Sequence, residues 1–274
     1  MTDTGIVEHV KRTKSLVFTV TPGRSGTKYL AMLLGGVPGV SAHHEPQPDF
    51  ATYMRACQKK SETAYAFWLY AKLPFIAAAA GSIYAETSHL FCKGFLEPAI
   101  LLGLRPKLII LRRSASEVAW SLLERKTVPA RTDLGLKYLL GPDDPGVMPL
   151  PDWQAMTDYQ LCFWYALEIE RRQLRYTEYA GKLGMPVAEV LQRDLGKPQA
   201  FKRMLEALNL GADEKVMLHH SAVSAGRHNK NARELQKPDD LGAQESRVWQ
   251  AILTYEPFLP ETMMEKYAPM SVAA

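Results

Sequence analysis

The chain has 274 residues, of which 47% are hydrophobic and 23% are charged, and both values are ordinary for a globular protein. This length suits one large α/β domain or two small ones. The net charge of +4 is too small to indicate nucleic-acid binding, although it would help to attract an anionic ligand. No apolar run is long enough for a transmembrane helix, and the polar N-terminus is unlike a secretory signal. We therefore expect a cytoplasmic protein without a membrane or nucleic-acid partner.

The cysteine and histidine patterns argue against a disulfide framework and against a metal site. The three cysteines are Cys57, Cys92 and Cys162. They are widely separated, odd in number and without a Cys-x-x-Cys pair, so we expect reduced thiols. His43, His44 and Glu45 are adjacent, but consecutive residues of a strand point to opposite faces. No other ligand set with recognisable spacing supports zinc or iron.

Hydrophobic patterns predict strands that alternate with helices along the chain. In chain order, we expect a strand at 15–20, a helix at 28–34, a strand ending near 43–46, helices over 49–80, a strand at 82–87, a helix at 95–102, a strand at 107–111, a helix after 114, a long helix at 153–179, a strand at 185–191 and a helix at 198–208. The continuous apolar run at 107–111 is typical of a strand buried on both faces of a parallel sheet. The alternation predicts an α/β fold with a mainly parallel central sheet flanked by helices.

Three further segments carry local signals. Ser114 and Glu117 fit an S-x-x-E capping box at the start of a helix. Residues 127–152 are rich in Pro, Gly and Asp without a clear period, which indicates a long functional loop such as a lid or a substrate loop. Residues 221–233 are also expected to form a loop, followed by helices near 244–253 and 261–267.

The turn at 21–29, with the sequence T-P-G-R-S-G-T-K-Y, is the most informative stretch. It contains two glycines (Gly23 and Gly26), two hydroxyl residues (Ser25 and Thr27) and two cations (Arg24 and Lys28). Between a strand and a helix, this composition is typical of a turn that binds phosphate at a helix N-terminus. The nucleotide loop G-x-x-x-x-G-K-[ST] is not satisfied, because the glycines are too close and Tyr29 stands where Ser or Thr would hold magnesium.

A second set of anion-binding residues follows the strand predicted at 107–111. That strand ends in Arg112 and Arg113, and the carboxyl edge of a parallel sheet is where α/β proteins bind ligands. Ser121 follows Arg113 by eight residues, two turns into the next helix, so both side chains can serve one ligand. A solvated strand end with a surface serine is the alternative interpretation.

Together the two sets resemble the motifs of sulfotransferases that use 3′-phosphoadenosine 5′-phosphosulfate (PAPS). Residues 22–27 match the family's loop for the 5′-phosphosulfate. Arg113 and Ser121 match the ends of its R-x-P-x-x-x-x-x-S motif for the 3′-phosphate, although Ser114 and Ala115 stand where the family often has Pro.

The resemblance spans about residues 15–235, and the segment 187–210 also resembles the family's later strand and helix. It implies a single sulfotransferase domain over residues 1–274 with a P-loop-like architecture, in which residues 236–274 form a helical extension.

The resemblance also implies which residues bind the donor. They are Pro22, Gly23, Arg24, Ser25, Gly26, Thr27, Lys28, Tyr29, Arg113, Ser121, Arg227 and Lys230. Arg24 would contact the transferred sulfuryl group and is therefore also a candidate catalytic residue. Tyr29 would lie against adenine, although a half-buried helix aromatic is an equal alternative. Arg227 and Lys230 belong to a loop that would close over the 3′-phosphate.

Three residues are candidates for the base that takes the acceptor's proton. Glu86 lies in a segment that resembles the one carrying the catalytic Glu of carbohydrate sulfotransferases. His89 is its rival, since a His in a comparable segment has this role in cytosolic members, and its ordinary pKa is nearer neutrality. Glu45, followed by Pro46, resembles an acceptor-side segment and is a substrate-binding residue or an alternative base. His44 beside it is the other expected acceptor contact.

The resulting expectation is a PAPS-dependent transferase that acts on a hydroxyl or amine of a carbohydrate or another small molecule. Its nucleotide product is adenosine 3′,5′-bisphosphate, and the scheme requires no metal. Two rivals remain at this point: a P-loop kinase for a small molecule, and a nucleotide-binding protein of the same fold without turnover. The identity of the acceptor and the oligomeric state stay open.

Overall fold

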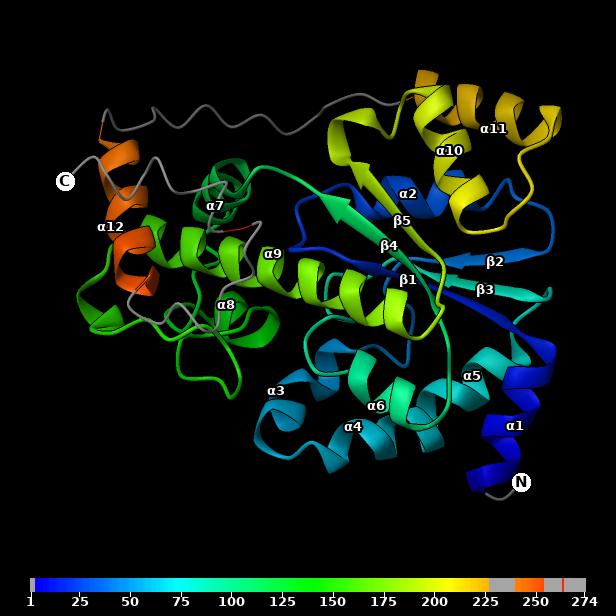
Figure 1. Cartoon of the computed structure of the whole chain (residues 1–274), viewed down its shortest axis with the longest axis horizontal. Helices are drawn as coiled ribbons and strands as arrows, with labels where there is room; N and C mark the ends of the chain where they lie inside the picture. The colour runs from blue at the N-terminus through cyan, green and yellow to red at the C-terminus, as the bar shows by residue number, and fades with distance from the viewer. Residues whose placement is uncertain (1–2, 227–239, 254–262, 264–274) are drawn as a thin grey trace. The chain divides into compact units, whose positions relative to one another are not determined.

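The computed structural model describes residues 3–226, 240–253 and 263 of the chain (Figure 1). The chain divides into two compact units. The first contains Met1–Arg113 and Tyr176–His228, and the second contains Ser114–Arg175 and Asn229–Ala274. Helix α9 (Asp158–Lys182) begins in the second unit and ends in the first.

The first unit is built on a sheet of five strands, all of them parallel. The strands are β1 (Ser15–Val20), β2 (Val40–His43), β3 (Ile83–Glu86), β4 (Lys107–Arg112) and β5 (Val187–Leu191). They lie in the order β2-β3-β1-β4-β5. The central strand β1 pairs with β3 from Ser15 opposite Ile83, and with β4 from Val17 opposite Lys107. The predicted α/β fold with a parallel central sheet is confirmed.

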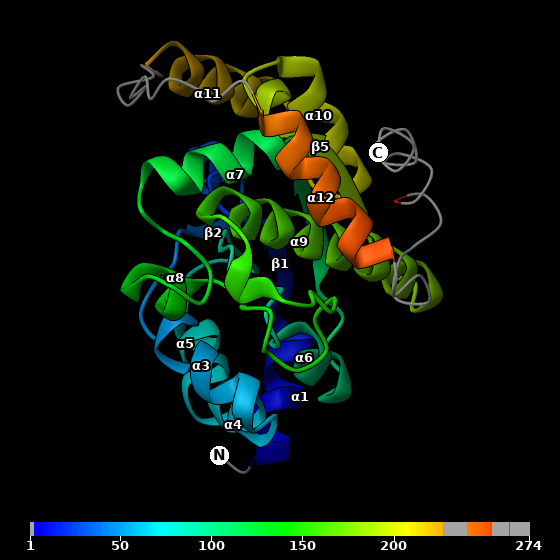
Figure 2. The same ribbon diagram turned by 90° about the vertical axis from the view of Figure 1, so that its left-hand side faces the viewer.

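Eight α-helices of the described residues belong wholly to this unit and cover both faces of the sheet. They are α1 (Asp3–Thr13), α2 (Thr27–Leu34), α3 (Ala51–Lys59), α4 (Glu62–Phe67), α5 (Leu73–Ala78), α6 (Leu96–Leu101), α10 (Pro198–Ala207) and α11 (Glu214–Ala225). Figures 1 and 2 show α2, α10 and α11 on one face and α1 with α3–α6 on the other. A π-helical turn, Trp68–Lys72, joins α4 to α5.

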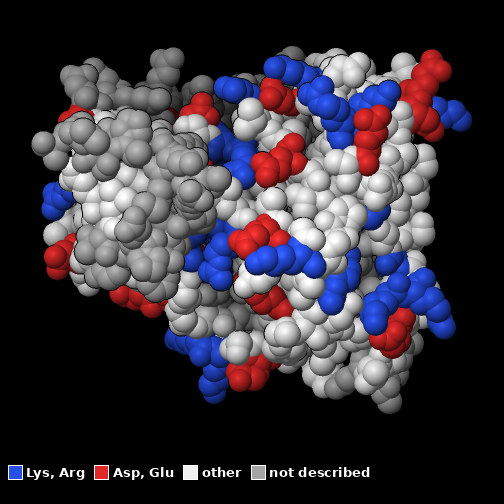
Figure 3. Space-filling model, in the orientation of Figure 1, with Lys and Arg blue, Asp and Glu red and all other residues white. Residues whose placement is uncertain are grey.

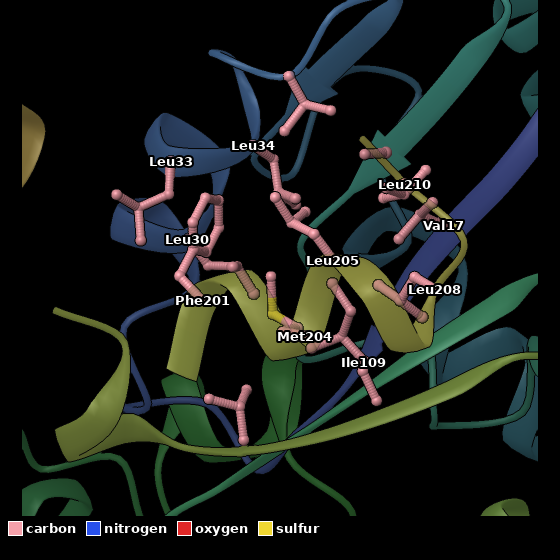
Figure 4. Close-up of a cluster of buried hydrophobic side chains, with 14 of the residues drawn as sticks. Val17, Leu30, Leu33, Leu34, Ile109, Phe201, Met204, Leu205, Leu208 and Leu210 are labelled. Atoms are coloured by element: carbon pink, nitrogen blue, oxygen red, sulfur yellow. The ribbon is translucent and has the colours of Figure 1, made fainter. Parts of the chain in front are cut away.

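One face of the sheet packs against α2 and α10 through an aliphatic core. Val17 of β1 and Ile109 of β4 point toward it, together with Leu30 of α2 and Phe201 of α10 (Figure 4). These strand residues alternate with others that face the opposite layer, because successive side chains of a strand point to opposite faces. Two-sided burial explains why β1 and β4 are apolar almost throughout.

The other face carries an aromatic core. The Phe18 ring stacks on Phe91 with ring centroids 4.3 Å apart, and Trp68 meets Phe18 edge-on at 5.7 Å. Phe50 and Phe95 extend this cluster toward α3 and α6, with centroids 4.7 Å apart. The aromatic rings fill the space between the sheet and helices that are only six to nine residues long.

The second unit is helical in its described part. Its elements are α7 (Ala115–Glu124), α8 (Asp133–Tyr138), a short 3-10 helix (Trp153–Ala155), most of α9, and α12 (Leu241–Leu253). Glu168 on α9 is completely buried and accepts hydrogen bonds from Arg171, Arg172 and the backbone N–H of Met148.

The segment 127–152 differs from the expected open loop. It contains α8, and its residues Leu140 and Met148 are buried. The bond from Met148 to Glu168 and a bond from the Trp164 indole to the Met148 carbonyl attach the segment to α9. Within its own unit the segment is therefore packed and partly helical rather than one long loop, and its role as a lid or substrate loop stays a prediction.

Two smaller sequence-based predictions also need correction. Ser114 stands at the N-cap of α7, but its side chain makes no capping hydrogen bond, so the predicted capping box is not formed. The predicted loop at 221–233 begins too early, because α11 continues to Ala225. Residues 227–233 and the helix expected at 261–267, apart from Met263, lie outside the described residues.

Cys57, Cys92 and Cys162 are all buried thiols, and no disulfide occurs among the described residues. Within the same part of the chain, every helix is too short or too polar to span a bilayer.

Candidate functional site

The turn between β1 and α2 lies at the carboxyl edge of the sheet and has an unusual backbone. Gly23, Arg24 and Gly26 all have positive φ angles, of 85°, 54° and 83°. Such angles are rare for a residue with a side chain, and strained residues of this kind concentrate at binding sites. Gly26 is the N-cap of α2 and supplies no side-chain cap. The N-cap residue therefore gives the first amide groups of α2 no side-chain acceptor, and a helix start of this kind suits an anion.

The side chains of the turn fall into two groups. Arg24 and Lys28 are exposed, so both cations lie at the surface of the turn. Thr21 and Ser25 are completely buried, and their hydroxyls are hydrogen-bonded to each other. This pair holds the turn from inside, and in this arrangement the Ser25 hydroxyl faces Thr21. Thr27 is 9% exposed, and Pro22 is buried.

Arg113 connects the end of β4 to this turn. Its guanidinium donates a hydrogen bond from Nη1 to the backbone carbonyl of Arg24, at 2.5 Å. The arginines of the two motifs found in the sequence are thus brought together by the fold. Ser121, the other member of the second motif, lies half-buried on α7 and belongs to the second unit.

The segment that follows β3 is tied to the same turn. The Thr87 hydroxyl donates to the carbonyl of Thr27 at 2.9 Å, and the Thr19 hydroxyl donates to the carbonyl of Ser88 at 2.9 Å. These bonds hold the segment against the turn and place His89 beside Gly23. A Cβ atom on Gly23 would lie 3.1 Å from the His89 ring, so the ring packs where only a glycine leaves room.

His89 and Glu45 form a hydrogen-bonded pair beside the turn. The distance between His89 Nδ1 and Glu45 Oε1 is 2.8 Å, and the side chains are 17% and 32% exposed. Glu45 itself has a positive φ of 48°, the second strained residue of the site after Arg24. The two residues are 44 positions apart in the sequence, and only the fold brings them together.

The electrostatics of this pair assign a tautomer to His89. Burial lowers the pKa of His89 to about 4, and nearby Lys93 acts in the same direction, while Glu45 opposes both. For Glu45, burial favours a higher pKa, but the hydrogen bond with His89 and the charges around it lower the pKa to about 2. At neutral pH the ring is therefore neutral, Nδ1–H donates to the Glu45 carboxylate, and Nε2 carries the lone pair that accepts a proton.

Glu86 is in a different environment. Its side chain is completely buried, 3.0 Å from the ammonium of Lys72, and it accepts a hydrogen bond from the Tyr84 hydroxyl. Burial raises the pKa of Glu86, while Lys72 opposes this shift. The ammonium lies 4.5 Å above the centre of the Phe50 ring, so the ion pair is enclosed by the aromatic core. This geometry suits a structural role better than contact with an acceptor.

The remaining predicted residues are placed as follows. The Tyr29 hydroxyl lies 2.6 Å from the Ser224 hydroxyl, and this hydrogen bond links α2 to α11. The Tyr29 side chain is half-buried. His44 is exposed, and its Nδ1 lies 2.8 Å from the Thr87 carbonyl, close to Glu45 in the chain. Arg227 and Lys230 lie outside the described residues.

Sequence reasoning missed the partners of these groups. Lys72 and Tyr84, which enclose Glu86, carried no motif, although Tyr84 two positions before Glu86 on a strand had to share its face. Among the described residues, no group of three or more His, Cys, Asp or Glu side chains is arranged to hold a metal ion.

No protein-family model matches the chain, and no curated protein matches it by sequence. Among solved structures, the chain is similar to a sulfotransferase domain from the curacin biosynthetic pathway, with 14% sequence identity and a TM-score of 0.49. The match covers 90% of this chain and 99% of that domain. At this identity and score the likeness assigns no reaction to this chain.

The buried ion pair gives a first prediction. Glu86→Gln leaves the Lys72 ammonium buried without a counter-charge, so we expect the free energy of unfolding to fall by about 3–5 kcal/mol in a denaturant titration. The double variant Lys72→Met/Glu86→Gln removes both charges and keeps an acceptor for Tyr84. The double variant should be more stable than Glu86→Gln alone. An equal or larger loss in its free energy of unfolding would contradict a structural role for the ion pair.

The second prediction concerns the pKa of His89. In an NMR titration, its ring should stay neutral down to pH 5 and titrate near pH 4, with the signal assigned from a His89→Asn sample. Glu45→Gln should lower this pKa further, because Glu45 favours the charged ring. Since an unfolded His titrates near pH 6.5, the unfolded chain binds the extra proton between about pH 4 and 6.5, and this group makes stability rise with pH across that window. A midpoint near 6.5 in the folded protein would refute this account.

Proposed function

We propose that this protein is a PAPS-dependent sulfotransferase, with the donor bound across the carboxyl edge of the sheet. The observation that carries the proposal is the hydrogen bond from Arg113 to the Arg24 carbonyl. It joins the two parts of the sequence that resemble the family's 5′ and 3′ phosphate motifs. Three features of the turn fit the phosphate-rich donor. Its backbone has positive φ angles, the N-terminus of α2 has no side-chain cap, and the cations Arg24 and Lys28 are exposed.

Each end of the donor has its own proposed residues. The backbone of Gly23–Thr27 and the side chains of Arg24 and Lys28 would hold the 5′-phosphosulfate, since amides and cations converge there. Arg113 would bind the 3′-phosphate, because a guanidinium can donate hydrogen bonds to two phosphate oxygens at once. Ser121, Arg227, Lys230 and stacking of Tyr29 on adenine remain proposals that rest on the resemblance.

When bound, PAPS supplies an activated sulfuryl group, and the chain supplies position, charge and a proton acceptor. His89 Nε2 would take the proton of the acceptor's hydroxyl or amine, while Glu45 holds the ring through Nδ1. Arg24 and Lys28 would stabilise negative charge on the departing phosphate. His89 is favoured over Glu86 because its side chain is partly exposed and neutral, whereas Glu86 is enclosed and ion-paired.

The acceptor is proposed only as a class: a carbohydrate or another small molecule with a hydroxyl or amine. His44 and the exposed part of Glu45 are the proposed acceptor contacts, because both lie at the end of β2 beside His89. The rival kinase reading is weaker since Tyr29 replaces the Ser or Thr that a P-loop needs after its Lys. A nucleotide-binding protein without turnover remains the alternative.

The third prediction tests the donor. Adenosine 3′,5′-bisphosphate should raise the melting temperature more than ATP with magnesium does, because a ligand at about 100 times its Kd adds about 2.7 kcal/mol of stability. Arg113→Ala should remove most of this stabilisation. Arg112→Ala is the matched control, since the Arg112 side chain binds Glu189 on β5 at 2.9 Å and should not matter. Preference for ATP, or equal effects of the two arginines, would end the PAPS proposal.

The fourth prediction tests the base by turnover at a temperature where each variant is folded. His89→Asn should lower kcat by about 10²–10⁴-fold, the usual contribution of a general base. Glu86→Gln should keep most of its activity per folded molecule. His219→Asn serves as the histidine control, because His219 is bound to the Met32 carbonyl on the outer side of α2 and α11. Full activity in His89→Asn would place the base elsewhere, and bisphosphate binding without turnover in the unmodified protein would favour the inactive alternative.

A further inference from the structure

The amino edge of the sheet, opposite the turn, carries a basic hollow of about 580 Å³. Its lining comes from the end of α1 with the start of β1, from the start of β3, and from the turn before β4. The cations around it are Lys11, Arg12, Lys14 and Arg105. Figure 3 shows lysine and arginine side chains on the α1 side of the molecule, with acidic side chains beside them. This edge is not where ligands of α/β sheets are expected.

Part of this charge has a structural explanation. Lys14 Nζ binds the carbonyls of Ala79 and Gly81, just after the end of α5, at 2.5 and 2.6 Å. Arg105 Nη1 binds the carbonyls of Ile100 and Leu104, at the end of α6. Cations at helix C-termini offset the negative end of the helix dipole.

These contacts with helix ends do not offset all of the positive charge around the hollow. Each helix C-terminus is equivalent to about half a negative charge, so the ends of α1, α5 and α6 offset about one and a half charges. Glu8 offsets one more through its pair with Lys11 at 2.7 Å. Four cations therefore exceed the local negative charge by about one and a half charges, in a hollow that is open to solvent.

The hydrogen-bond donors around the hollow are also only partly used. The Lys14 ammonium has three N–H groups and uses two of them on carbonyls, and the Arg105 bonds engage only one of its three nitrogens. Arg12 makes no hydrogen bond or ion pair within the described residues. The hydroxyl residues Ser15 and Ser82 line the same hollow and add groups that can donate to an oxyanion.

We infer that this hollow binds a small soluble anion with two or more negative charges, of the phosphate-ester class. Guanidinium and ammonium groups from separate segments, together with hydroxyls, match a phosphate better than a single carboxylate. The volume falls within the range of small-molecule sites. The hollow is separated from the turn at Gly23 by the length of β1, about 20 Å for six residues, so the two sites are distinct. This inference does not depend on the proposed reaction.

The experiment uses pyrophosphate as the probe, measured by calorimetry on the full chain at low salt without divalent metal. All variants are made in an Arg24→Ala background, which weakens binding at the turn. Pyrophosphate should bind this background, and Arg12→Gln with Arg105→Gln should weaken binding about tenfold or more. Lys202→Gln with Arg203→Gln, two exposed cations on α10, removes the same charge elsewhere and should have little effect.

Several outcomes would overturn the inference. They are no binding of pyrophosphate to the Arg24→Ala chain, equal affinity with and without the hollow's arginines, and equal weakening by the α10 control. Citrate carries a similar charge, and binding as tight as that of pyrophosphate would reject the phosphate class. If loss of the Arg105 contacts unfolds the chain, Arg12→Gln alone should still weaken binding about threefold or more. A second set of the hollow's variants keeps Arg24. In that set adenosine 3′,5′-bisphosphate should still stabilise the chain, so failure of this inference and failure of the proposed function can be told apart.

Discussion

The site depends on the hydrogen bond between the Thr87 hydroxyl and the carbonyl of Thr27. It joins the segment after β3 to the first turn of α2, two pieces of chain 60 residues apart. The Thr87 backbone N–H also binds the carbonyl of His43, so the ends of β2 and β3 and the start of α2 share one junction. Because both partners are buried, the bond is protected from water, and breaking it would leave polar atoms unsatisfied. The distance from His89 to the turn is set by this junction.

The two layers of the fold make that junction rigid. The aliphatic layer fixes α2 against β1 through residues such as Leu30 and Val17. The aromatic layer fixes the opposite face of β1 and β3, and the ion pair of Lys72 with Glu86 sits within it. An ion pair enclosed by aromatic rings has few alternative arrangements, because any shift exposes a charge to apolar surroundings. Glu86 therefore fixes the end of β3 one residue before Thr87.

Much of this fold was accessible from the sequence, because its strands are continuous apolar runs and its turns carry glycine. The strand at 15–20, the turn after it and the strand ending at Arg112 needed only hydrophobic pattern and composition. The pairing of His89 with Glu45 was not accessible, since no local rule relates positions 44 residues apart. The packing of 127–152 was also missed, because its contacts with α9 come from scattered apolar residues rather than from a period. The motifs thus identified Glu86 and His89 as candidates, and only the tertiary contacts show that Glu86 is enclosed in an ion pair whereas His89 is partly exposed.

The neutral ring of His89 lies against Gly23, within the turn that collects positive charge. A histidine in this position does not have a fixed pKa, because its affinity for a proton depends on what occupies the turn. An anion held by Arg24 and the amides of α2 would favour the protonated ring and move its pKa from about 4 back toward neutrality. With the turn empty, the imidazole is a weak base with little tendency to attract a proton from solvent. An anion in the turn would therefore raise the proton affinity of the ring, so that one glycine and the ring packed upon it couple the binding of an anion to the binding of a proton.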